Sequence, residues 1–515
     1  MRVEWKKMLL GFAVFAGMTM MLSCSNEENY DPGGEPGVTE EPTETAFLSF
    51  YVGAGSLAGT RMIAVDPTDP GREEEQVVER VRMVLYENKA ATVRYSWDLD
   101  ARRGNGGSFE GSHVVPNSGS PDRFITIGQE VVRQDYKLLI LVNAPPQLLD
   151  VTEKGRRLEE LHREANVMKI DLTTPNGIAA DNNFYMTNDQ GLIDVPKDEL
   201  KPTKNDAEVS PFMVHVERAV AKVVVKEPES GIVVTPDGDA ISDLSWGLDI
   251  TNRYMYWMRQ MTYTASGMME GPGVSRRERY AMDPNFEGLH HYDEVTLGNY
   301  FEYLDVSDPL MDLPKQFGEY DYVAENTMAA DEQYKNVTTR VILRGIYRPS
   351  GINLPANTRS GATGISFFTF EGLVFSVQQM ANLVNNLPGD PGELSEPVLQ
   401  RLHAVIIGFP DPSRLTNPQA SFSENGIRYY HNGVSYYTIQ IRHFDDGQVS
   451  EPMGLGRYGV VRNNVYNITV RSILGPGEPV IEKPVEPNDD PAYISADVNV
   501  LPWSVRTQDV EDLYN

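Results

Sequence analysis

The sequence predicts an all-β protein with a few short helices, organised as two tandem antiparallel β-sandwich domains behind a leader and an acidic tether. Short runs in which every second residue is apolar recur along the chain, as expected of strands with one buried face. Turn-forming residues separate these runs, and helical periodicity is clearest at residues 376–386, with a second instance at 158–168. At 515 residues with 40% hydrophobic content, the chain is long enough for each domain to bury a core.

A secretory leader opens the chain. Basic residues within the first seven positions precede an apolar run at residues 8–22, which ends just before Cys24, the only cysteine. The run is too short to span a bilayer comfortably, and the small Ser23 before Cys24 is typical of a lipoprotein signal-peptidase site. We therefore expect residues 1–23 to be removed and Cys24 to be acylated on its sulfur, as with palmitate. Met21 departs from the leucine usual at its position, which leaves an uncleaved anchor or unprocessed secretion as alternatives.

Residues 24–45 follow as an acidic segment. They contain Glu and Asp among Pro and Gly and almost no apolar side chains, so they cannot bury enough surface to offset the entropy of ordering. We expect a disordered tether. Because lipid consumes the single cysteine, the chain has no disulfide framework and no thiol catalyst, and its stability must come from packing and sheet hydrogen bonds.

The first predicted domain, residues 46–228, begins with a regular strand pattern. At residues 47–52 the side chains of Leu48, Phe50 and Val52 point one way and the intervening ones the other. Further strands are expected at residues 81–85, 136–142 and 214–225. A polar stretch with Pro and Gly follows directly and is typical of a domain junction.

The second predicted domain, residues 229–515, continues in the same manner. Its expected strands are residues 245–251, 338–347, 367–375, 435–443 and 465–474. A last strand follows the Gly- and Pro-containing residues 475–491, and its apolar face consists of Ile494, Ala496, Val498 and Val500.

The charge and the histidines exclude several classes of function. A formal net charge of -29 argues against nucleic acid and against adsorption to anionic lipid, since both require a basic face. The eight histidines assemble no recognisable catalytic or metal set, and the densest polar cluster, around His290 and His291, lacks the spacing of metal ligands. We therefore expect no catalytic residues, no metal, no cofactor and no enzyme, with membrane contact only through the lipid.

Seven strings, in the order in which they occur, resemble the Bacteroidales fimbrillins, which are the type V pilins, and most closely the minor (short-fimbria) branch. They are DYKLLILVN (135–143), FYMTN (184–188), VERAVAKV (216–223), RGIYRP (344–349), YYTIQIRH (436–443), VRNNVYNITV (461–470) and VNVLPW (498–503). Each alone is an ordinary strand sequence, but their joint order is specific and spans almost the whole mature chain.

The resemblance implies a lipoprotein precursor of two β-sandwich domains that is exported, cut by a trypsin-like, arginine-specific protease and polymerised by β-strand exchange. The matching cleavage site lies between Arg61 and Met62, in the loop after the first strand, and Arg72 is the competing site. The acidic residues after Cys24 are similar to the signal that sends Bacteroidetes lipoproteins to the outer face of the outer membrane, the alternative being a spacer without an address.

Cleavage makes the first strand removable. Burial of Leu48, Phe50 and Val52 contributes about 1.5–3 kcal/mol each, so their departure leaves a groove lacking about 5–9 kcal/mol of apolar contact. A strand from another subunit can refill that groove by β-augmentation. The apolar face at residues 494–500 is the candidate donor; if it completes its own sandwich instead, residues 504–513 can make the intermolecular contact.

The implied function is that of a structural subunit of a cell-surface fimbrium (pilus) that supports adhesion. Its implied partners are other fimbrillin subunits, including anchor and tip subunits, the arginine-specific protease, and a host or bacterial surface receptor. The precursor is expected at the cell outer membrane and the mature protein in the extracellular fimbrium. Two alternatives share the leader: a tip or anchor fimbrillin, and a surface glycan-binding lipoprotein, which does not account for the ordered strings.

Overall fold

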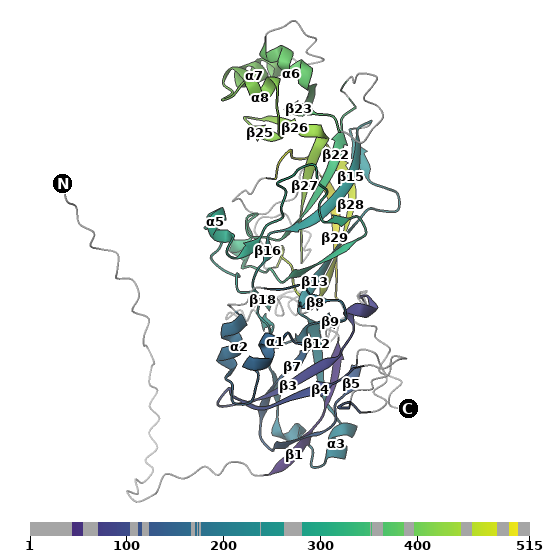
Figure 1. Cartoon of the computed structure of the whole chain (residues 1–515), viewed down its shortest axis with the longest axis vertical. Coiled ribbons are helices and arrows are strands. Elements are labelled where there is room, and N and C mark those ends of the chain that lie inside the picture. The colour runs from purple at the N-terminus through teal and green to yellow at the C-terminus, as the bar shows by residue number, and fades with distance from the viewer. Residues whose placement is uncertain are drawn as a thin grey trace, which may run out of the picture. The chain divides into compact units, whose positions relative to one another are not determined.

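The computed structural model describes residues 44–54, 71–102, 112–115, 123–165, 170–172, 174, 177–236, 238–261, 281–350, 352, 364–385, 396–443, 456–481 and 494–502. These residues are mostly β, with several sheets and a few short helices, and the chain from Glu44 onward forms one compact unit (Figure 1). The predicted leader and almost all of the predicted tether lie outside the described residues. The first strand begins at Thr45, the last residue of the predicted tether.

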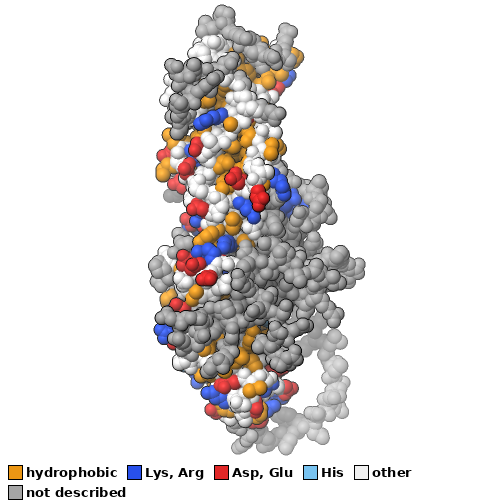
Figure 2. All heavy atoms as spheres, turned by 90° about the vertical axis from the view of Figure 1, so that its right-hand side faces the viewer, with side chains coloured by type: hydrophobic (Ala, Val, Ile, Leu, Met, Phe, Trp, Pro, Cys, Tyr) orange, Lys and Arg blue, Asp and Glu red, His pale blue; other side chains and the backbone are white. Residues whose placement is uncertain are grey.

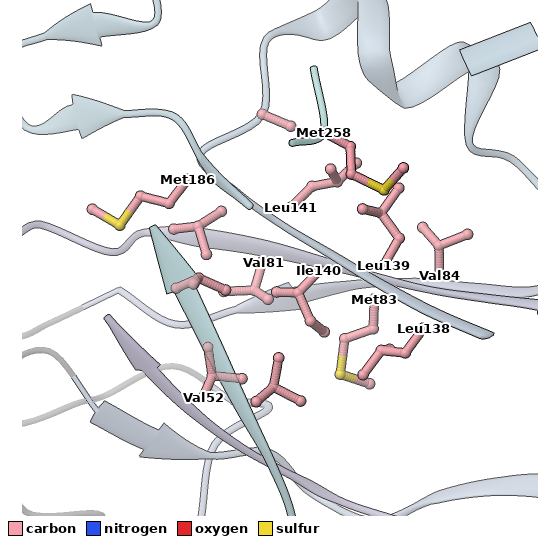
Figure 3. Close-up of a cluster of buried hydrophobic side chains, with 14 of the residues drawn as sticks. Val52, Val81, Met83, Val84, Leu138, Leu139, Ile140, Leu141, Met186 and Met258 are labelled. Carbon is pink, nitrogen blue, oxygen red and sulfur yellow. The ribbon is translucent and has the colours of Figure 1, made fainter. Parts of the chain in front are cut away.

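The first large sheet has eight strands. In the order in which they pair they are β4 (Val93–Asp100), β3 (Arg80–Glu87), β7 (Tyr136–Val142), β10 (Met186–Asn188), β12 (Phe212–Arg218), β2 (Phe50–Ala54) and β5 (Arg123–Ile125), while β11 (Ile193–Val195) pairs with β7. The sheet curls, so that Val52 of β2 faces the buried side chains of β3 and β7 (Figure 3). This curl encloses the first hydrophobic core.

Both faces of the central strand β7 are buried, which explains why its sequence is apolar at successive positions. Leu138 and Ile140 lie on the face toward Val52, whereas Leu139 and Leu141 lie on the opposite face with Met258 (Figure 3). The opposite face is covered in part by helices α1 (Pro146–Val151) and α2 (Leu158–Ala165), which contribute Leu148 and Leu161 to the core. The predicted helix at 158–168 is thus confirmed over the residues of α2.

The second half of the chain is built around two further sheets. One contains β14 (Val233–Thr235), β28 (Asn464–Leu474), β13 (Val220–Lys226), β21 (Tyr320–Ala324) and β29 (Ile494–Pro502). The other contains β20 (Lys315–Gln316), β15 (Ala240–Asp249), β22 (Arg340–Arg348) and β27 (Val434–Gln440). Side chains from both sheets share one buried cluster, among them Val223, Ile468, Trp246 and Ile439, so the two sheets enclose a common core.

A small α+β module is inserted between β22 and β27. It consists of β23 (Phe367–Phe370), β24 (Leu373–Ser376), β25 (Phe422–Glu424) and β26 (Ile427–Tyr430), with helices α6 (Val377–Val384), α7 (Glu396–Ile407) and α8 (Ser413–Thr416). The module has a hydrophobic core of its own. Helix α6 begins with a capping box, in which Ser376 and Gln379 exchange side-chain and backbone hydrogen bonds. The predicted helix at 376–386 is therefore confirmed over the residues of α6.

The remaining elements are short. They are the strand pairs β1 (Thr45–Leu48) with β6 (Gln129–Val132), β8 (Ala179–Ala180) with β9 (Asn183–Phe184), β16 (Thr251–Asn252) with β19 (Phe301–Glu302) and β17 (Gln260–Met261) with β18 (Ala281–Met282), helices α3 (Lys204–Val209) and α5 (Glu294–Leu297), and the 3-10 helices η1 (Glu73–Glu75), η2 (Lys197–Glu199), η3 (Ala330–Glu332) and η5 (His431–Gly433).

Three expected strands are each divided in two. The predicted strand 47–52 breaks at Ser49, where the chain exchanges its partner β6 for β12 and β5. The predicted strand 214–225 breaks at Ala219, because β12 belongs to the first large sheet and β13 to the next. The predicted strand 367–375 is the hairpin β23–β24, whose turn places Glu371 and Gly372 at φ 48° and 80°. Alternation of apolar and polar residues indicates a strand, but it does not reveal where the strand changes the neighbouring strand with which it pairs.

The prediction of purely antiparallel sheets is wrong for three strand pairs. β12 runs parallel to β2, and β28 runs parallel to both β13 and β14. Parallel neighbours require long connections, and here the partners come from distant parts of the chain. The boundary predicted after residue 228 stays a prediction; the change of sheet itself occurs at Ala219.

Candidate assembly groove around the first two strands

Strands β1 and β2 are integrated into the fold along both of their edges. β1 pairs with β6, and on its other side Phe47 and Lys201 exchange backbone hydrogen bonds of 2.7 and 2.9 Å. β2 lies between β12, to which it is parallel, and β5, to which it is antiparallel. We call the space that β1 and β2 occupy between β6, β12 and β5 the assembly groove.

The predicted apolar face of these strands is buried in the assembly groove. Leu48 is 2% exposed, Phe50 0% and Val52 1%. The ring of Phe50 meets the ring of Phe212 edge to face at a centroid distance of 6.3 Å. Figure 3 shows Val52 facing Ile140 and Met83. The predicted alternation is confirmed for the three side chains, whereas their displacement stays a prediction.

Thr126 fixes the chain at the break between β1 and β2. The backbone N–H of Phe50 donates to Thr126 Oγ1 at 2.9 Å, and the N–H of Thr126 donates to the carbonyl of Phe50 at 2.9 Å. The hydroxyl of Ser49 donates to the Thr126 carbonyl at 2.6 Å. Sequence reasoning missed Thr126; the run of β-branched residues at 125–127 was the available signal.

Several predicted site residues lie outside the described residues. These are the lipidation site Cys24, the cleavage site Arg61 and Met62, and the tail at residues 504–513. The chain is described up to Ala54 at the end of β2 and again from Gly71. Any cut within residues 55–70 therefore separates β1 and β2 covalently from the rest of the fold.

The competing cleavage residue, Arg72, is described and is held by several partners. Its guanidinium forms ion pairs with Glu75 at 3.0 Å and with Asp181 at 2.8 Å, and donates to the hydroxyl of Tyr322 at 2.9 Å. The side chain is 29% exposed. Arg72 is thus held within the fold by these side-chain contacts.

The candidate donor residues Ile494, Ala496, Val498 and Val500 lie in β29. This strand pairs antiparallel with β28, from Ile473 opposite Ile494 to Asn464 opposite Pro502. Since β13 and β14 take the other edge of β28, β29 is at the end of its sheet within the described residues. The structure therefore shows the strand completing its own sheet, which is one of the two expectations, and leaves its donation to another subunit a prediction.

Two further features of the described residues bear on ligand binding. Among the described residues no group of three or more His, Cys, Asp or Glu is arranged to hold a metal ion. His290 instead lies 2.6 Å from a carboxylate oxygen of Glu332 and stacks on Tyr334. A cavity of about 470 Å³ beside β3 and β4 is lined by arginine, carboxylate, histidine and aliphatic side chains, without the aromatic platform typical of sugar sites.

The visible surface charge is mixed. Figure 2 shows acidic and basic side chains interspersed with hydrophobic ones on the described part of one face, and no broad basic area there. The net charge of the whole chain is -29, and the exclusion of nucleic acid as a partner stays a prediction from the sequence. None of the described helices combines the length and apolarity needed to cross a membrane.

Comparison with known proteins finds a family match in the C-terminal part of the chain. Residues 428–509 match the family model of the major fimbrial subunit protein type IV, Fimbrillin, C-terminal. Three of the seven strings quoted above, at 436–443, 461–470 and 498–503, lie inside this match. No curated protein matches the chain.

Solved structures with a similar arrangement include proteins of bacterial surfaces. A fimbrilin (fimA) from Porphyromonas gingivalis W83 is 14% identical with a TM-score of 0.42, covering 90% of this chain and 99% of that one. The tip fimbrial protein Mfa3 from the same species is 10% identical with a TM-score of 0.36, covering 89% and 100%. A cell-adhesion candidate from Parabacteroides distasonis is 14% identical with a TM-score of 0.43, covering 90% and 99%.

The matched residues include the C-terminal strands β27, β28 and β29. The match is to structural proteins of cell-surface fimbriae and not to enzymes. Residues 428–509 are therefore similar to the C-terminal part of the fimbrillins, with no branch of that family distinguished.

Proposed function

We propose that the protein is a shaft subunit of a cell-surface fimbrium, of the minor (short-fimbria) branch, which matures by losing β1 and β2 and polymerises by strand exchange. The observation that carries the proposal is the state of these two strands. They are buried and paired like core strands, yet only residues 55–70 join them to the rest of the fold. After a cut in those residues, β1 and β2 are held by non-covalent contacts alone.

The emptied assembly groove supplies the driving force for polymerisation. Loss of Leu48, Phe50 and Val52 removes about 5–9 kcal/mol of apolar burial. In addition, β12 loses its parallel partner over Phe212 to Val216, and β5 loses its antiparallel one. Unpaired backbone groups in a dry groove are costly, so a strand from another subunit is bound in their place. Before the cut, the chain's own strand blocks this edge.

Maturation also explains the leader. Lipid on Cys24 anchors the precursor at the outer membrane, and cleavage after Arg61 separates both lipid and tether from the folded remainder. Because β1 and β2 leave with the lipid, release from the membrane and opening of the assembly groove are one event. The fixed position of Arg72 supports Arg61 as the cleaved residue.

The donor strand comes from the C-terminal end. β29 supports this proposal because it lies at the end of its sheet and carries alternate apolar residues. If β29 stays paired with β28 in the fibre, residues 504–513 make the contact between subunits instead.

Two matched substitutions test the maturation step. We expect Arg61→Ala to leave a lipid-bound precursor that forms no fibres, whereas Arg72→Ala matures normally with Met62 as its first residue. N-terminal sequencing of protein sheared from cells, together with electron microscopy of the same cells, measures both. Fibres of unchanged length from Arg61→Ala cells, or a mature protein that begins at Glu73, contradict the proposal. Wild-type protein that keeps its lipid and caps fibres identifies a tip or anchor subunit.

A further inference from the structure

A charged cluster fastens the segment that directly follows residues 55–70. We call it the Arg72 knot: Arg72, Glu75, Asp181, Lys222 and Tyr322. Arg72 and Glu75 come from the short helix η1 and the residue before it, Lys222 from β13 and Tyr322 from β21. The knot therefore joins a segment that leads into the first large sheet to two strands of the next sheet.

Glu75 is at the centre of the Arg72 knot. Its side chain is 0% exposed, and its Oε1 accepts hydrogen bonds from Lys222 Nζ at 2.8 Å and from the Tyr322 hydroxyl at 2.5 Å. Its Oε2 accepts from the backbone N–H of Arg72 at 2.7 Å. The backbone carbonyl of Glu75 accepts from Nε of Arg218 in β12 at 3.0 Å. Opening η1 thus breaks several buried charge-assisted hydrogen bonds at once.

The guanidinium of Arg72 is held by members of the knot at two of its nitrogens. Nε pairs with Glu75, and Nη2 contacts both Asp181 and Tyr322, whereas Nη1 lies 3.5 Å from the exposed carboxylate of Glu74, outside the knot. The ring of Tyr320 lies 4.6 Å from its Cζ. A trypsin-like protease must draw the arginine into its own acidic pocket and extend the residues on either side. Here the following residues form η1, so the knot must open before the bond can be cut.

We propose that the Arg72 knot shields the Arg72–Glu73 bond from arginine-specific proteases and so confines cleavage to residues before Gly71. This inference rests on the proposed arginine-specific maturation and names a feature that limits where the protease can cut. Its consequence is that maturation removes β1 and β2 only. The segment from Gly71 onward remains fastened across the two sheets, and the mature subunit keeps η1 and β3.

Limited trypsin digestion of the full-length protein in detergent tests the shielding, with N-terminal sequencing and intact mass as readouts. We expect the folded wild type to yield no product that begins at Glu73. Glu75→Gln and Tyr322→Phe each remove part of the buried network, and cleavage after Arg72 becomes at least about tenfold faster. Glu74→Gln is the matched control: its carboxylate is 46% exposed, so the rate changes by less than about twofold.

A second site distinguishes local opening from global unfolding. Arg462 is 0% exposed, so cleavage after it reports loss of the whole fold. A product beginning at Glu73 while the bond after Arg462 stays intact supports the local knot. Cleavage at both positions in step, or wild-type cleavage after Arg72 as fast as in the variants, overturns it. If no cut occurs within residues 55–70, the proposed maturation is contradicted but the shielding is not. The two outcomes are distinguishable because the product of such a cut and the product that begins at Glu73 differ in mass.

Discussion

Phe50 illustrates how a strand can be stable in its groove and yet replaceable. Its hydrogen bonds to Thr126 use only its backbone N–H and carbonyl, which every residue except proline offers. Its side chain contributes burial against Phe212, which another apolar side chain can supply. The local alternation predicted Phe50 as a buried residue. Thr126 is 76 residues away: the β-branched residues at 125–127 indicate a strand there, but no local pattern indicates that this strand contacts Phe50.

The donor strand should be sensitive to charge on one face only. We expect Val498→Asp to reduce fibre yield by more than about tenfold, since it replaces an apolar contact of about 1.5–3 kcal/mol with a carboxylate that cannot be buried unpaired. Asn499→Asp places the same charge at the next position, on the alternate face, and should polymerise normally. Detergent-resistant ladders on unheated gels measure both. Equal ladders from the two variants contradict donation by this face.

At the scale of elements, the sequence pattern indicated most strands but not their partners. The strand at 136–142 is confirmed residue for residue, and those at 338–347 and 465–474 within a few residues. The parallel pairing of β13 with β28 was not predictable, because it depends on how distant parts of the chain meet. For the same reason the Arg72 knot was missed: Glu75 and Lys222 are 147 residues apart, and each looks like an ordinary surface charge in the sequence.

The Arg72 knot should make stability depend on pH in the acid range. Burial of the Glu75 carboxyl opposes its ionisation, but hydrogen bonds from Lys222 and Tyr322 prevail and hold its pKa below the ordinary 4.5. A carboxyl group whose pKa is lower in the folded than in the unfolded protein stabilises the fold at pH values above its unfolded pKa. This stabilisation is lost as the pH falls below that pKa. We expect the free energy of unfolding at pH 7 to be about 3 kcal/mol larger for the wild type than for Glu75→Gln. This difference should shrink as the pH falls below 4.5.

Urea unfolding of both proteins from pH 3 to 7 measures that difference. Subtracting the two free energies of unfolding at each pH removes the opposite pH dependence of other groups. One such group is Asp283, because burial raises its pKa to about 8. A difference that stays constant down to pH 3, or grows on acidification, contradicts the account of the knot.

Across the described residues of the molecule, the first strands and the last strand occupy different kinds of position. β1 and β2 enter the first hydrophobic core, whereas β29 lies at the end of its sheet. The mostly β character and the buried face at Leu48, Phe50 and Val52 followed from the sequence, because alternation is a local signal. The parallel pairs and the inserted module with its own core did not, since they depend on contacts between distant segments.

Competition by a synthetic peptide of residues 44–54 tests the central claim, that the assembly groove of one subunit is filled by a strand from another. Fibre growth from processed subunits is followed by light scattering as the peptide is added, with a Phe50→Asp peptide as the matched control. We expect the wild-type peptide to stop growth at concentrations on the order of micromolar, because it restores the apolar burial, and the control peptide to leave growth unchanged. Growth that continues unchanged at saturating wild-type peptide contradicts strand exchange at this groove.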